Sequence, residues 1–142
     1  MTMSAERNKA RMLDLIARVM NDHDVNALPE FTANPSVAGS VLGLVTAFPD
    51  LVAQVVWIVA EGEMVTAYLE VRGTHLGPWI WVQEPTGRPI TTAFLLALRF
   101  DPEGQIVDQW LGSNFVAMLE QMGWGIAPVG ETASASAIGS HR

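Results

Sequence analysis

The chain of 142 residues contains no cysteine. Without thiols it can form no disulfide, no thiolate metal site and no cysteine nucleophile. Basic residues are scarce as well, because 8 Lys and Arg residues stand against 15 Asp and Glu residues, which gives a formal net charge of -7. A chain with this charge offers no basic patch to a phosphate backbone, so we expect no nucleic-acid partner.

Long apolar runs are also missing. No segment approaches the roughly 20 consecutive apolar residues of a membrane-spanning helix. The opening stretch MTMSAERNKARMLDLIARVM mixes charged residues with apolar ones, unlike a signal peptide. We therefore expect a cytoplasmic protein with no membrane partner. Because 49% of the residues are hydrophobic and only 16% are charged, the composition is typical of a globular fold, and the length suits one domain.

Motifs for metal, phosphate or acyl-transfer chemistry are absent from the sequence. It has no H-E-x-x-H pattern or other metal-ligand spacing, no glycine-rich phosphate loop after a strand, and no nucleophile elbow around a serine. We therefore expect no metal.

The first third of the chain is helical in pattern. Apolar residues recur at helical spacing in residues 5–20, the stretch NDHDVNALPEF predicts a short second helix, and residues 36–48 predict a third. Gly39 and Gly43 lie four residues apart in the third helix. Because glycine lowers helix propensity, we expect this face to pack closely against a sheet or a ligand.

Four segments rich in β-branched and aromatic residues follow, in the order LVAQVVWIVA, VTAYLEVRG, ITTAFLLALRF and QIVDQWLG. The loops at 61–63 and 101–104 carry turn residues. Three helices followed by a four-stranded antiparallel sheet predict an α+β fold, with the helices on one face of a curved sheet. The connection 75–89 is long and carries two tryptophans, which is typical of a lid or a pocket wall.

The end of the chain changes character. NFVAMLEQMGW predicts a short C-terminal helix that ends at Gly123. The rest, GIAPVGETASASAIGSHR, is small, polar and without pattern. We therefore assign residues 1–124 to a single domain and expect residues 125–142 to form a disordered tail.

The stretch IVDQWLGSN, residues 106–114, holds the first candidate for chemistry. In a regular strand, Ile106, Asp108 and Trp110 share one face. If this largely apolar face lines a pocket, burial raises the pKa of Asp108, which then suits a general base or acid near neutral pH. Alternatively, Asp108 lies close to the turn and stays hydrated.

The second strand offers two interpretations. Thr66, Tyr68, Glu70 and Arg72 share one face, and aliphatic residues occupy the other. If the polar face lines the pocket, Tyr68 and Glu70 are candidates for proton transfer. If the aliphatic face packs under the helices, the polar face is a solvent or dimer surface.

Two further polar residues are open to a catalytic and a structural interpretation. His75 follows a strand, and its ordinary pKa suits acid–base chemistry, but its ring could equally cap backbone groups of the following loop. Asn114 could hydrogen-bond a developing oxyanion, or it could be the N-cap of the last helix.

Large apolar side chains suggest the walls of a pocket for a flat, apolar ligand. The alternative is an ordinary core. The tryptophans of the long loop, Trp79 and Trp81, are the pair we expect to contact a ligand. The other candidates for the wall are Trp110, Phe48, Phe94 and Met118.

Several phrases together resemble the SnoaL-like polyketide cyclase family of the NTF2-like superfamily. In order and spacing they are NDHDVNALPEF, TAFPDL, VAEGEMVTAYLEVRGTHLG, PTGRPI and LRFDPEGQIVDQWLGSNFVAMLEQMG, and they cover roughly residues 13–124. The resemblance implies an NTF2-like cone, in which N-terminal helices pack on a curved antiparallel sheet around an apolar pocket. It also implies a homodimer, with no metal and no organic cofactor.

The resemblance also implies a reaction. Founding members of the family close a ring by intramolecular aldol condensation, with an acidic side chain in the pocket as general base. Relatives isomerise, open epoxides, hydroxylate without a cofactor, or only bind.

This sequence departs from the family pattern at three places. Asn114 stands where members carry an aspartate, four residues after the tryptophan of the last strand, and an amide cannot act as a general base. The segment TANPS keeps only Asn34 and Pro35 of a longer His-Asn-Pro-like segment, and Leu96 replaces an inward polar residue. Asn34 and Leu96 remain among the expected substrate contacts.

These observations predict a cofactor-independent cyclase or isomerase that acts on a hydrophobic polyketide-like intermediate of secondary metabolism. Asp108 is the first candidate for the proton-transfer residue, followed by Glu70 and Tyr68, and Asn114 is the candidate for the oxyanion contact. The alternatives are an epoxide-opening cyclase or hydrolase, and a non-catalytic small-molecule-binding protein of the same fold.

Overall fold

The computed structural model describes residues 3–125 and 127–129, so most of the predicted tail at 125–142 lies outside the described residues. Helices come first and strands follow. In chain order the elements are α1 (Met3–Leu15), a π-helical turn (Ile16–Asn21), a 3₁₀ turn (Val25–Ala27), α2 (Leu28–Phe31), α3 (Pro35–Ala47), β1 (Val52–Glu61), β2 (Met64–Thr74), β3 (Pro89–Phe100), β4 (Ile106–Ser113) and α4 (Phe115–Gln121). No helix among these described residues is long and apolar enough to cross a membrane.

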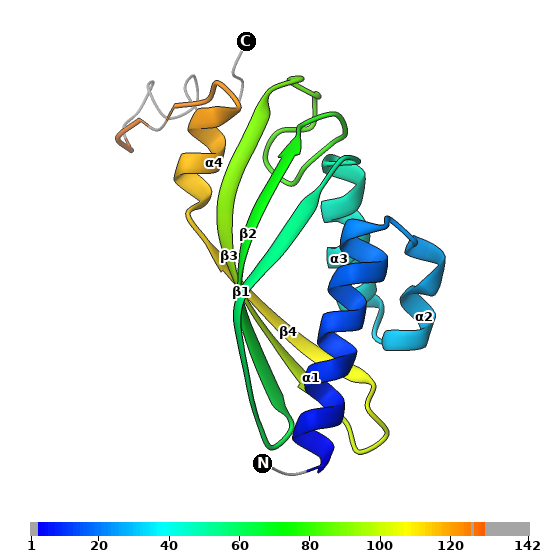
Figure 1. Cartoon of the computed structure of the whole chain (residues 1–142). Helices are drawn as coiled ribbons and strands as arrows, with labels where there is room; N and C mark the ends of the chain where they lie inside the picture. Colours follow the sequence, from blue (N-terminus) through cyan, green and yellow to red (C-terminus); the bar gives the residue numbers. More distant parts are fainter. Residues whose placement is uncertain (1–2, 126, 130–142) are drawn as a thin grey trace.

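The strands form one antiparallel sheet in the order β1-β2-β3-β4. Helices α1, α2 and α3 gather on one side of this strongly twisted sheet, and α4 lies beside β3 at the same end as the C-terminus of α3 (Figure 1). The hairpins turn at Gly62 and Gly104, whose φ angles of 61° and 85° lie in the left-handed region that glycine tolerates. The predicted α+β architecture, with N-terminal helices packed on a curved antiparallel sheet, is confirmed.

The first helix places its apolar stripe against the sheet, as its periodicity predicts. Met12 and Leu15 of α1, and Ile16 and Val19 of the π-helical turn that continues it, are all buried in the core. The helix therefore packs through the residues that its sequence spacing indicates. It runs along the side of the sheet that the helices cover (Figure 1).

The burial of the two faces of β2 shows which side of the sheet the helices cover. Val65, Ala67, Leu69 and Val71 are buried under the helices. Since side chains alternate along a strand, the intervening polar residues, Tyr68 and Glu70 among them, point away from the helices. Of the two interpretations of this strand, the one with an aliphatic inner face and a polar outer face is correct.

A β-bulge in β4 changes the faces of its residues. Ile106 is opposite Phe100, but Asp108 is opposite Arg99, so Val107 is an extra residue in the strand. Ile106 is buried, whereas Asp108 faces outward together with Arg99. The expectation that Ile106, Asp108 and Trp110 share one face is therefore wrong, because one inserted residue reverses the alternation.

The glycines of α3 do not serve close packing within this chain. A Cβ added at Gly39 or Gly43 would meet nothing within 4 Å, and both residues are exposed. The helix packs through Val37, Val45 and Ala47 instead. The expectation that a sheet packs against the glycine face is wrong for the described structure, because the apolar stripe of the helix lies on its other side. The alternative, a ligand against this face, stays a prediction.

Candidate functional site

A pocket lies at the end of the sheet where β2 finishes and β3 begins. Its walls come from the C-terminal half of α3, the inner faces of β2 and β3, and α4. The lining residues are Leu44, Phe48, Leu51, Val71, Gly73, Ile90, Thr92, Phe94 and Met118. The empty space, open mouth included, is about 190 Å³, which is below the roughly 300–1,000 Å³ of typical ligand sites. The pocket is therefore small in this conformation.

Three of the predicted contacts line this pocket, namely Phe48, Phe94 and Met118. The element that carries each residue explains its position in the lining. Phe94 is on the inner face of β3, Met118 is the buried residue of α4, and Phe48 directly follows α3. Leu96 is also buried on the inner face of β3, but it lies further along the strand and does not line the pocket.

Thr92 is a polar residue of the pocket lining that sequence reasoning missed. Among the described lining residues it alone carries a polar side chain, and none of them is titratable. The hydroxyl oxygens of Thr92 and Ser113 lie 3.1 Å apart, and Ser113 donates to the carbonyl of Ala93 at 2.8 Å. The signal was present in the sequence, because Thr92 is two residues before Phe94 and so shares its strand face.

Asp108 lies outside this pocket. Its carboxylate forms an ion pair with Arg99 on the outer face of the sheet, where Arg99 Nε donates to Asp108 Oδ2 at 3.1 Å, and the Asp108 side chain is 45% exposed. The prediction of a desolvated base in the pocket is therefore wrong for Asp108, because the β4 bulge turns its side chain away.

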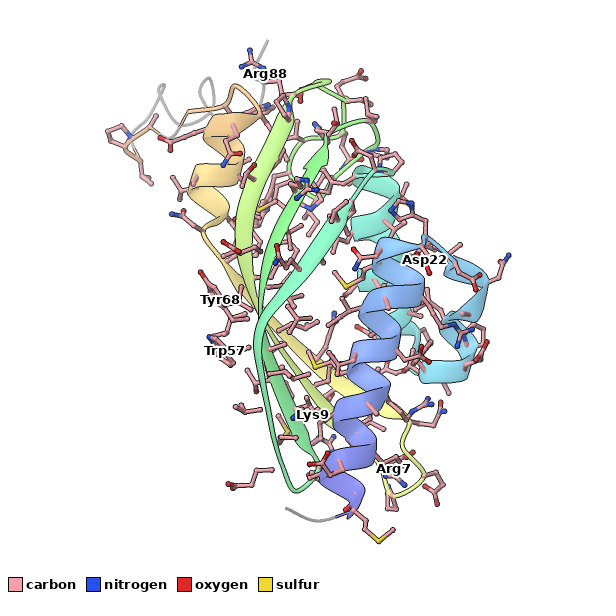
Figure 2. All side chains as sticks on the ribbon, in the orientation of Figure 1. Arg7, Lys9, Asp22, Trp57, Tyr68 and Arg88 are labelled. Atoms are coloured by element: carbon pink, nitrogen blue, oxygen red, sulfur yellow. The ribbon has the colours of Figure 1, made fainter. Side chains whose placement is uncertain are left out.

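The other outward-facing candidates also lie away from the pocket. The ring of Tyr68 stacks on that of Trp57, with centroids 5.9 Å apart and planes at 13°, and both project from the side of the sheet opposite α1 (Figure 2). Glu70 is exposed on the same face, and Trp110 is 52% exposed. The structure therefore contradicts the placement of Tyr68, Glu70 and Trp110 at a pocket wall, because the aliphatic face of β2 is the one that is covered.

Both candidate asparagines are helix caps. Asn114 Oδ1 accepts from the backbone N–H of Ala117 at 3.0 Å at the start of α4. Asn34 Oδ1 accepts from Ser36 N–H at 2.9 Å at the start of α3, and its amide donates to the Val107 carbonyl at 2.8 Å. The structure places neither in the pocket lining, so the capping interpretation of Asn114 is the one that the geometry supports.

His75 holds the loop that follows β2. It is fully buried, its backbone N–H donates to the Arg88 carbonyl at 3.0 Å, and its Nδ1 accepts from the Thr86 N–H at 3.2 Å. Burial lowers the pKa of His75, and the nearby carbonyls of Val82 and Gly77 offset this only in part. The imidazole is therefore neutral near pH 7 and ties the two ends of the loop together, as the structural interpretation of this residue predicts.

The two loop tryptophans stand behind the pocket wall. Trp79 is buried, with its ring 6.3 Å from Phe48 and 5.1 Å from Trp81. Trp81 in turn lies 5.3 Å from Phe115 in α4. This aromatic cluster joins the loop to α4 beside Phe48. Trp79 and Trp81 do not line the pocket in this conformation, but they support two of its walls.

Comparisons with known proteins identify the family of this chain. The family model of the SnoaL-like polyketide cyclases matches residues 10–122. AclR of Streptomyces galilaeus, a candidate hydroxylase, is a similar solved structure with 26% identity and a TM-score of 0.69, over 84% of this chain and 82% of that chain. IdmH of Streptomyces antibioticus, a candidate polyketide cyclase, has 27% identity and a TM-score of 0.62, over 82% of this chain and 98% of its own.

A third structure supports the fold alone. A candidate SnoaL-like polyketide cyclase from Jannaschia sp. CCS1 is 17% identical with a TM-score of 0.73, over 86% of this chain and 95% of that chain. No curated protein matches the sequence. Because the family model covers most of the chain and the structural neighbours share its helix-and-sheet architecture, the protein belongs to the SnoaL-like polyketide cyclase family.

Proposed function

We propose that this protein is a cofactor-independent cyclase that binds a hydrophobic polyketide-type intermediate in the pocket between α3 and α4. Membership of the SnoaL-like polyketide cyclase family supports the reaction class. The observation that carries the proposal is the pocket lining, which is apolar on every side apart from the hydroxyl of Thr92. Such a lining suits the hydrocarbon and ring surface of a folded polyketide.

The pocket would act by folding its ligand. Holding two reacting carbons of one molecule in contact gives effective concentrations of about 10⁵–10⁸ M. In an aldol closure, a carbon–carbon bond forms as the attacking carbon gives up a proton and the attacked carbonyl oxygen takes one up. Since no described lining residue is titratable, water exchanges these protons, and the walls decide which carbons meet.

A ligand of polyketide size requires the pocket to open. The empty space of about 190 Å³ is too small for a multi-ring molecule. Met118 is the only described lining residue supplied by α4, so an outward shift of this short helix is the simplest way to enlarge the site.

A non-catalytic binding protein is the second candidate. The same absence of titratable groups among the described lining residues favours it. An epoxide-opening reaction needs an acid and a base on one ligand. The carboxylates expected to supply them, Asp108 and Glu70, lie on the outer face of the sheet, so the structure lends this alternative no support.

The test is the metabolite profile of the native host after deletion of this gene. A cyclase predicts accumulation of an isomer of the normal product, at identical mass. We expect Asp108→Asn to restore the normal profile, because Asp108 lies outside the pocket, and Leu44→Trp to fail, because its indole fills the pocket. Leu42→Trp is the matched control, since Leu42 is exposed on the same helix.

The outcomes separate the candidates. If a folded Asp108→Asn protein does not restore the profile, the Asp108 carboxylate takes part in the reaction and the proposal is contradicted. An unchanged profile in the deletion strain would contradict a role in the closure. A ligand recovered intact from the purified protein after long incubation would favour the binding protein.

A further inference from the structure

The hydroxyl pair beside the pocket has a fixed direction. Ser113 Oγ lies 2.8 Å from the Ala93 carbonyl oxygen, and a carbonyl can only accept a hydrogen bond. Ser113 Oγ also lies 3.1 Å from Thr92 Oγ1 and 3.8 Å from the Met118 sulfur, but the Ala93 carbonyl is the nearest of the three, and a thioether is a weak acceptor. The single Ser113 proton is therefore donated to Ala93. In the 3.1 Å contact between the two hydroxyls, Thr92 must then be the donor and Ser113 the acceptor.

This direction leaves Thr92 with lone pairs only. A hydroxyl has one proton and two lone pairs, and the proton of Thr92 is committed to Ser113. Any additional partner of Thr92 Oγ1 must therefore be a donor. Met118 covers the pair from α4, with its sulfur 3.8 Å from Ser113 Oγ, so a ligand that displaces Met118 reaches these hydroxyls.

The other lining residues offer no hydrogen-bond partner to a second polar group of a ligand. Among the described lining residues, all except Thr92 are apolar side chains or glycine. A buried carboxylate would lose its hydration without a partner, and a ligand oxygen that can only accept would find no donor.

We propose that the pocket selects uncharged ligands of apolar or aromatic body that donate one hydroxyl hydrogen bond, of phenol or enol type, to Thr92. This inference rests on the proposed function, since it names the ligand chemistry of the same pocket. It assigns Thr92 as a specificity-determining residue and Ser113 as the residue that sets the direction of the Thr92 hydroxyl.

Three flat probes of matched shape test it in the purified full chain by calorimetry or ligand-observed NMR. They are 2-naphthol, which donates, 2-methoxynaphthalene, which only accepts, and 2-naphthoate, which is charged. We expect the naphthol to bind about three- to tenfold more tightly than the ether, as one hydrogen bond predicts. The naphthoate should bind most weakly.

Two variants should remove this preference by different routes. Thr92→Val should weaken naphthol binding and leave ether binding unchanged, because the acceptor is lost. Ser113→Ala should instead tighten ether binding, because the Thr92 proton is released and can be donated to the ligand. Thr91→Val is the control, since Thr91 is exposed on the outer face and should retain the wild-type ratio.

The results distinguish this inference from the function on which it rests. If the wild type binds naphthol and ether equally and Leu44→Trp abolishes the binding of both, the selectivity is overturned, but the pocket is still the binding site. Ether binding that Ser113→Ala does not improve, in a variant with a wild-type melting temperature, would overturn the assigned direction. Binding that Leu44→Trp leaves unchanged, or no binding of any probe, would overturn the inference, whereas the cyclase proposal is tested separately, by the metabolite profiles of the deletion strain and of its Asp108→Asn complement.

Discussion

Three polar residues that could have contacted a ligand, Asn34, Asn114 and His75, instead hydrogen-bond the backbone of this chain. Asn34 and Asn114 both cap helices, and His75 fastens a loop. In each case the residue type suits both roles, because an amide or an imidazole satisfies backbone groups as readily as ligand atoms. What distinguishes the roles is whether the side chain reaches the pocket, and these three do not line it.

His75 makes a prediction about pH. Its folded-state pKa is lowered from 6.5 by burial, so below pH 6.5 the unfolded chain binds a proton that the folded protein resists. The contribution of this residue to stability is therefore full above pH 6.5 and falls as the pH drops, by up to about 1.4 kcal/mol per pH unit. Denaturant unfolding at pH 7.5, 6.5 and 5.5 measures it.

The variant His75→Asn separates this effect from general acid sensitivity. We expect its free energy of unfolding at pH 7.5 to be lower by about 1–3 kcal/mol, because a buried hydrogen-bonding group is disturbed, and its decrease between pH 7.5 and 5.5 to be shallower than in the wild type. An equally steep decrease in the variant would assign the pH dependence to other groups.

At the scale of elements, α4 completes a sheet edge that β4 leaves open. β4 ends at Ser113, opposite Phe94, so Thr91 on β3 has no strand beside it on that side. The side-chain amide of Gln121 takes this place, accepting from the Thr91 N–H at 2.7 Å and donating to the Thr91 carbonyl at 2.9 Å. One side chain therefore docks the helix that carries Met118 over the pocket.

Removal of this amide should loosen α4. We expect Gln121→Ala to lower the free energy of unfolding by about 1–2 kcal/mol, because two hydrogen bonds to backbone groups are lost. Hydrogen exchange at the Thr91 amide should become faster. The neighbouring exposed Glu120→Ala is the control. If the two variants have the same stability and the same exchange at Thr91, Gln121 does not hold the helix.

The bulge in β4 is the feature of the sheet that the sequence pattern does not predict. The four strands, their order and the helix that follows them could be predicted from apolar runs and turn residues. The extra residue Val107 could not, because a valine is an ordinary strand residue and gives no local signal of a bulge. Strict alternation therefore places Asp108 on the face of Ile106, although its neighbour in the structure is Arg99 on the outer face.

For the whole molecule, the outer face of the sheet is an exposed surface that the pocket does not explain. It carries exposed apolar side chains on three strands, namely Val52, Val56, Trp57 and Val59 on β1, Leu95 on β3 and Trp110 on β4. Apolar patches of this kind on soluble proteins typically mark interaction sites. We propose that a second copy of the chain covers this outer face, as the family resemblance implies.

A charge on this face should prevent the association. We expect the wild type to be a dimer by light scattering coupled to size-exclusion chromatography, and Trp110→Glu to be a monomer, because an unpaired carboxylate would be buried at the interface. Leu42→Glu, at an exposed leucine on α3, should stay dimeric. A monomeric wild type at micromolar to millimolar concentration would contradict the proposal.

The sequence by itself determined the element order, the apolar stripe of α1 and the turns at Gly62 and Gly104, because each follows from residue spacing or turn residues within a short stretch of the chain. Three of the pocket residues followed from side-chain type alone. Only the tertiary structure decided which face of β2 is covered, that Asp108 points outward, and that Thr92 is the polar group of the pocket. Alternation along a strand defines two faces, but which of them is buried depends on where distant helices pack and on a bulge that no local pattern records.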